Sequence, residues 1–88
     1  MNNDRRKRIA KVRALIEQMS SLYEEAKSEV ESVKEDEEDA RSNLPESLEN
    51  SDRAQTMDNA LEKLDEVVNA FETFDIEQIL NDLDEAAA

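Results

Sequence analysis

An apolar residue recurs every three or four positions from Ile9 to Leu44, and this repeat keeps its phase throughout. A strict alternation of three and four places such residues on one side of a helix wound to about 3.5 residues per turn, which is typical of a coiled coil. The sequence therefore predicts one long helix, over about residues 4–42. The members of this seam are Ile9, Val12, Ile16, Met19, Tyr23, Ala26, Val30, Val33, Glu37, Ala40 and Leu44.

Composition favours an all-α fold. The 88 residues include no glycine and one proline, and 40% are charged. This composition favours long helices and disfavours strands and tight turns. A net charge of −13 is also typical of disordered chains. The unbroken apolar repeat argues against disorder, because a disordered chain has no reason to keep apolar residues in register.

The second half of the chain is predicted to contain a turn and a broken helix. Asn3 or Asp4 caps the first helix, and Pro45 ends it within a turn over residues 43–51 that includes a short helical piece. Ser51 caps a second helix over about 52–73, and Asp75 caps a short third helix over about 76–85. The apolar positions here are Ala54, Met57, Leu61, Leu64, Val68 and Phe71, followed by Ile76, Leu80, Leu83 and Ala87.

We expect these helices to form one antiparallel hairpin domain over residues 1–88. Six of the eleven basic residues fall within residues 5–13, whereas residues 72–88 carry six acids and no base. An antiparallel hairpin brings these two blocks together, and exposed ion pairs of this kind select an orientation more than they add stability. The expected register places Tyr23 near Leu64 and Asp65. It also places Arg41 near Glu46 and Glu49, and Arg53 near Glu37 and Glu38.

A hairpin of this length buries only one stripe per helix, and such thin cores are marginal. We therefore expect two copies to associate as a homodimer that forms a four-helix bundle. The residues predicted to form the packing or dimer seam are Leu15, Ile16, Met19, Leu22, Tyr23, Leu61, Leu64, Val68, Phe71 and Ile79.

The sequence predicts a nonenzymatic protein that acts by binding another protein. Cysteine and histidine are absent, and the remaining polar side chains suggest no catalytic site, cofactor, metal or small-molecule substrate. No run of residues is apolar enough to span a membrane or to form a signal peptide, so we expect a cytoplasmic protein. The candidate partner-binding residues are the carboxylates Glu35, Asp36, Glu38, Asp39, Asp82, Asp84 and Glu85.

Two alternatives remain open at this stage. Rows of carboxylates on a helix can imitate a nucleic-acid backbone, so the protein could inhibit a host defence enzyme or another nucleic-acid-processing enzyme. The basic residues from Arg5 to Arg13 could instead bind nucleic acid or an anionic membrane surface. This second alternative is disfavoured, because the strongly acidic molecule repels phosphate at longer range.

The segment that begins at Asn43, NLPESLENSDRAQTMDNALEKLDEVVNAFE, resembles short phage and prophage proteins. These have an acidic first helix, an NLPESL-type turn and a second helix rich in leucine and glutamate. The resemblance implies a helical hairpin and a phage origin, and therefore the cytoplasm of a host cell, but it implies no activity. Ala54 stands where the pattern often has glycine, which would make the second break more helical here.

Overall fold

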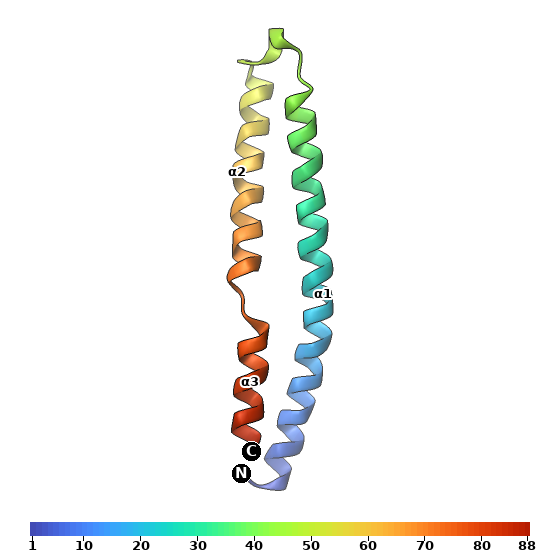
Figure 1. The fold of residues 1–88 in the computed structure, drawn as a ribbon, viewed down its shortest axis with the longest axis vertical. Coiled ribbons are helices and arrows are strands. Elements are labelled where there is room, and N and C mark those ends of the chain that lie inside the picture. Colours follow the sequence, from blue (N-terminus) through green and yellow to red (C-terminus); the bar gives the residue numbers. More distant parts are fainter. The chain divides into compact units, whose positions relative to one another are not determined.

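The computed structural model describes residues 1–88 and contains helices but no strands (Figure 1). Its elements are α1 (Asn3–Ser42), the short 3₁₀ helix η1 (Glu46–Leu48), α2 (Asp52–Thr73) and α3 (Ile76–Ala87). The prediction of an all-α fold is confirmed. These elements form two compact units, which we call the terminal unit (Met1–Glu25 and Phe74–Ala88) and the turn unit (Ala26–Thr73).

Helix α1 begins after a cap that differs from the predicted one. The side-chain oxygen of Asn2, not that of Asn3 or Asp4, accepts a hydrogen bond from the backbone amide of Arg5 at 2.9 Å. This bond satisfies one of the free amides at the helix start. The helix then continues to Ser42, because its interior contains neither glycine nor proline.

Local hydrogen bonds define the connection between α1 and α2. Pro45 adopts an extended conformation, with φ −58° and ψ 148°, and its carbonyl accepts the amide of Leu48 at 2.8 Å to form the η1 turn. Ser51 then caps α2, since its hydroxyl oxygen accepts the amide of Ala54 at 3.2 Å and donates to the carbonyl of Leu48 at 2.6 Å. The connection therefore occupies the whole interval between Ser42 and Asp52.

A second cap starts α3. Asp75 has extended backbone angles, and its carboxylate accepts the amide of Gln78 at 3.0 Å. The preceding helix α2 ends at Thr73, whose hydroxyl donates to the carbonyl of Ala70. The break thus arises because Asp75 provides a polar acceptor for the free amides of a new helix.

The turn unit is an antiparallel helical hairpin. Arg41 Nε lies 2.8 Å from Asp58 Oδ1, and Lys34 Nζ lies 2.8 Å from Asp65 Oδ1, so later residues of α1 meet earlier residues of α2 (Figure 1). Ala54 and Val68 are buried between the helices. The other apolar residues on this face of α2 are half-buried: Met57, Ala60, Leu61, Leu64 and Phe71.

In the terminal unit, α3 runs antiparallel to the first part of α1, so the two chain ends lie side by side (Figure 1). Arg13 Nε lies 2.8 Å from Asp84 Oδ1, and Arg6 Nε donates to the carbonyl of Ala87 at 3.1 Å. Ile76 is the buried apolar residue of this unit. The expected meeting of the basic start with the acidic end therefore occurs.

The predicted register is wrong in both units. The ring of Tyr23 lies 5.6 Å from that of Phe74, between centroids, rather than near Leu64 and Asp65. Asp65 instead pairs with Lys34. The reason is the length of the connection: residues between Ser42 and Asp52 are outside the paired helices, so pairing starts further along the chain.

Because the register differs from the predicted one, only some of the ion pairs expected near the turn are present. Arg41 Nη1 does lie 3.4 Å from a carboxylate oxygen of Glu49, but Arg41 forms no ion pair with Glu46. Arg53, however, forms no ion pair, and Glu38 lies 3.9 Å from Lys34 Nζ instead.

The inward face of α1 also differs from the predicted seam. In the terminal unit its half-buried residues are Ile9, Arg13, Ile16, Ser20 and Tyr23, whereas the seam members Val12 and Met19 are exposed. In the turn unit the half-buried residues are Lys27, Val30, Lys34, Glu37 and Arg41, and the seam members Ala26, Val33 and Ala40 are exposed. The apolar surface of α1 is wider than one helix contact. The side of it that packs inward is the one that carries Arg13, Lys34 and Arg41, which form ion pairs across the helices.

Candidate protein-binding site

The first half of α1 carries a row of exposed apolar side chains. Val12, Leu15, Met19 and Leu22 are 43%, 53%, 38% and 67% exposed. Their spacing of three, four and three residues places them on one helix face. We call these four residues the α1 stripe.

The contact with α3 is centred on the face of α1 that neighbours the stripe, where Ile9, Ile16 and Tyr23 are half-buried. Single exposed apolar residues are ordinary, but four consecutive members of one helical repeat are not, because contiguous apolar surface usually marks a site of interaction. The stripe is therefore the strongest candidate binding surface of the terminal unit.

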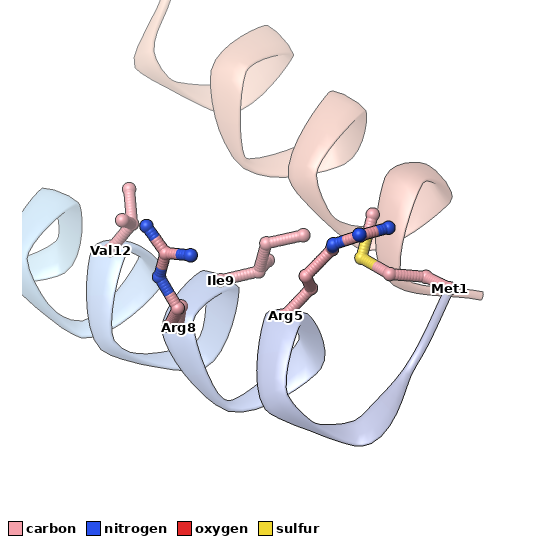
Figure 2. A pocket seen from close by; sticks show the side chains of 5 residues that line it. All are labelled: Met1, Arg5, Arg8, Ile9 and Val12. Atoms are coloured by element: carbon pink, nitrogen blue, oxygen red, sulfur yellow. The ribbon is translucent and has the colours of Figure 1, made fainter.

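An open pocket of about 320 Å³ adjoins the N-terminal end of the stripe (Figure 2). Met1, Ile9 and Val12 give it an almost wholly apolar lining. Figure 2 shows the guanidinium groups of Arg5 and Arg8 beside these apolar side chains. An apolar hollow between two cations suits an apolar side chain that is followed by a carboxylate.

Charged residues bracket the stripe with opposite signs. Arg8 and Lys11 lie at its N-terminal end, and Glu25 lies beside Leu22 at its other end; all three are exposed. None of the three takes part in an ion pair within the chain. Their charges are thus available to a partner that lies along the stripe.

The ion pair between Arg13 and Asp84 holds the two helices of the terminal unit together. The hydrogen bond from Arg13 lowers the pKa of the Asp84 carboxyl below its ordinary value, and the same bond raises the pKa of Arg13. Arg13 also pairs with Glu17 one turn along α1. Asp84, one of the predicted partner-binding carboxylates, is therefore already engaged within the chain.

Two further cations hold the hairpin of the turn unit. Lys34 donates a hydrogen bond to Asp65, and Arg41 donates one to Asp58; these bonds raise the pKa values of Lys34 and Arg41. Beside Lys34 lies an open groove lined by Glu31, Lys34, Glu35, Glu38 and Val68. Three carboxylates around one cation leave this groove negatively charged, so it is better suited to a cationic ligand than to an anionic one.

The other predicted partner-binding carboxylates are exposed. In the turn unit they are Glu35, Asp36, Glu38 and Asp39, and in the terminal unit they are Asp82 and Glu85. Two of them also contact a side chain of their own unit: Glu38 lies near Lys34, and Asp82 near Gln78. Asp82 accepts a hydrogen bond from the side chain of Gln78 at 2.9 Å. The structure brings no group of three or more acidic residues into a geometry that could hold a metal ion.

The residues of the predicted packing or dimer seam separate into two groups. Leu15, Met19 and Leu22 are exposed on the α1 stripe. The others face a neighbouring helix within their own unit: Ile16, Tyr23 and Ile79 in the terminal unit, and Leu61, Leu64, Val68 and Phe71 in the turn unit.

Sequence reasoning missed the pairing of Lys34 with Asp65 and of Arg41 with Asp58, and it gave Arg13 no individual partner. A usable signal was present, since Lys34 and Arg41 are seven residues apart and so are their partners, Asp58 and Asp65. Matching repeats of opposite charge on two antiparallel helices indicate positions that face each other.

Comparisons of this chain with family models, with curated proteins and with solved structures found no match. No helix is both long enough and apolar enough to cross a membrane.

Proposed function

We propose that this chain is a nonenzymatic protein that acts by binding another protein, and that the α1 stripe is its contact surface. The observation that carries the proposal is the exposure of Val12, Leu15, Met19 and Leu22 on one helix face. Opposite charges at the two ends of the stripe give a partner both an orientation and a register.

The thin core supports association as part of this function. Only Ala54, Val68 and Ile76 are buried apolar residues, which is few for a chain of 88 residues. Small domains with little buried apolar surface commonly gain stability from a second chain. We propose a homodimer that packs as a four-helix bundle, and the resemblance at the NLPESL segment leads us to propose a phage origin.

The test is the oligomeric state of a variant with a polar stripe. Leu15→Gln/Leu22→Gln removes two apolar contacts, keeps the net charge and keeps residues with good helix propensity. The matched control, Ala14→Gln/Ser21→Gln, introduces the same two glutamines one position earlier, at exposed residues outside the stripe. Light scattering at micromolar concentration should give an assembled wild type and control and a dissociated stripe variant. A monomeric wild type that recovers no protein partner from a host extract would refute the proposal.

A second candidate function is imitation of a nucleic-acid backbone. It is favoured by the exposure of Glu35, Asp36, Glu38 and Asp39 on one segment of α1, where only Glu38 approaches a cation. A mimic must bind a nuclease or another nucleic-acid enzyme in competition with DNA or RNA, and the binding must weaken steeply as salt rises. Binding that is insensitive to salt would exclude this function.

Direct binding of nucleic acid or an anionic membrane through the basic start has weaker support. Arg13 pairs with Asp84, and Arg6 donates to Ala87 and Asn3, so two of the six bases have partners within the chain. A gel-shift assay and vesicle co-sedimentation at low salt test this alternative, and the absence of both complexes would remove it.

A further inference from the structure

We propose that the α1 stripe binds the α1 stripe of a second copy, antiparallel, about a twofold axis that crosses the stripe midway between Leu15 and Met19. This inference rests on the proposed function and specifies its partner, orientation and register. It is argued from the spacing of the stripe, from the charges at its ends and from the pocket beside Val12.

The spacing of the stripe is symmetric about Glu17. Val12 and Leu22 are equally distant from that residue, and so are Leu15 and Met19. A twofold axis midway between Leu15 and Met19 places Val12 of one copy opposite Leu22 of the other, and Leu15 opposite Met19. Such an isologous contact needs one surface that is complementary to itself, which a symmetric spacing provides.

The charges select the antiparallel orientation. The twofold axis brings Arg8 and Lys11 of one copy beside Glu25 of the other, at both ends of the contact. A parallel pair would place the bases together and the acids together, and like charges that face each other across an interface disfavour that arrangement.

The pocket of the terminal unit fits the same register. Leu22 is the most exposed of the large apolar residues. In the proposed dimer it reaches the second copy at Val12, which lines the pocket together with Met1 and Ile9 (Figure 2). Glu25, one helical turn after Leu22, then lies near the Arg8 guanidinium. The pocket thus has the apolar lining and the flanking cation that this pair of side chains requires.

A second copy also supplies the buried apolar contacts that a single chain lacks. Each protomer buries only three apolar side chains, and the antiparallel contact covers four more from each copy. A second copy is present wherever the chain is made, whereas any other partner must be supplied. Burial of the α1 stripe in a dimer therefore adds apolar contacts to a protomer that has few of its own.

Disulfide cross-linking tests orientation and register directly, because the chain contains no cysteine. Val12→Cys and Leu22→Cys are prepared as two proteins that differ in mass through a tag, mixed and oxidised mildly. In the antiparallel register, the introduced thiol of the Val12→Cys protein faces that of the Leu22→Cys protein. In a pair of Val12→Cys proteins, the two thiols are separated by about 15 Å along the helix axis, too far for a disulfide. We expect the mixed cross-link to exceed either self-cross-link by at least about tenfold.

The outcomes separate this inference from the proposed function. Self-cross-linking of Val12→Cys would indicate a parallel pair, and assembly without either cross-link would place the interface elsewhere. Both results overturn the antiparallel register but leave the proposed binding function intact. A wild type that stays monomeric and captures a different protein overturns the second copy as partner. A monomer with no partner at all overturns the proposed function as well.

Discussion

Arg13 of α1 donates a hydrogen bond to Asp84 of α3 across 2.8 Å, while its neighbour Val12 is 43% exposed. The Arg13 side chain is itself 37% exposed, so the two helices meet here through an exposed ion pair that leaves Val12 exposed beside it. With Leu15, Met19 and Leu22, Val12 forms the exposed apolar row that leads us to place the binding surface on α1.

Removing either partner of this ion pair should lower the melting temperature. We expect Asp84→Asn to lower it by no more than a few degrees, because the pair is exposed. Arg13→Gln should have a larger effect, since Arg13 also pairs with Glu17. Thermal unfolding of the two single variants and the double variant measures the coupling. Strictly additive effects would mean that the pair contributes nothing to the fold.

The same pair predicts a dependence on pH. Arg13 lowers the pKa of Asp84 below its ordinary value of 3.8 in the folded chain. The pair therefore stabilises the folded chain above the unfolded pKa, and this contribution is lost as the pH falls through the lower, folded pKa. The wild type should melt above Asp84→Asn at about pH 6, and the difference should shrink and then disappear as the pH falls through the lowered pKa of Asp84.

The variant is the necessary reference in that experiment, because protonation of the other carboxylates also reduces the repulsion that follows from a net charge of −13. That change affects both proteins alike. A difference in melting temperature that persists unchanged in acid would show that Asp84 acts through packing rather than through its charge.

The positions where helices begin and end were predictable from the sequence because they depend on neighbouring residues. Ser51 and Asp75 accept amide hydrogens three residues ahead, and Pro45 lies in the connection between α1 and α2. Each of these signals is local and carries its own physical cause. The cap at Asn2 was missed by a single residue, within the usual variation of helix ends.

The register and the inward face of α1 were not predictable from periodicity. An apolar repeat fixes the spacing of contact residues along a helix. The apolar surface of α1, however, is wide enough to allow more than one contact face. The choice depends on residues distant in sequence, such as Arg13 with Asp84 and Lys34 with Asp65. The register also depends on how many residues the connection occupies, which helix signals do not specify.

Adjacent valines in α2 offer a matched test of the turn unit. Val68 is 8% exposed and Val67 is 41% exposed. We expect Val68→Ala to destabilise the chain by about 1.5–3 kcal/mol, through lost burial and a residual cavity. Val67→Ala removes the same atoms from a more exposed site and should have a clearly smaller effect. Urea unfolding followed by circular dichroism measures both, and equal losses would contradict the burial of Val68.

The cap of α3 should contribute measurably to the terminal unit. Asp75→Ala removes the acceptor for the amide of Gln78 and should cost about 1 kcal/mol. Asp75→Asn retains an acceptor oxygen and changes only the charge, so it should recover most of the loss. Amide hydrogen exchange should show the largest change in the first turn of α3. Equal destabilisation by both variants would assign the effect to charge rather than to capping.

Charge reversal should convert the proposed homodimer into an obligate heterodimer. Arg8→Glu/Lys11→Glu makes both ends of the stripe acidic, and Glu25→Lys makes both ends basic. Each variant alone should dissociate, because like charges then meet across the antiparallel contact, whereas an equimolar mixture should assemble with opposite charges at both ends. The acidic variant should keep its helix, since carboxylates near a helix start are favourable. Sedimentation velocity at low salt distinguishes the three samples, and high salt should reduce the difference. Assembly of each variant alone as strong as that of their mixture would show that these three charges do not face each other.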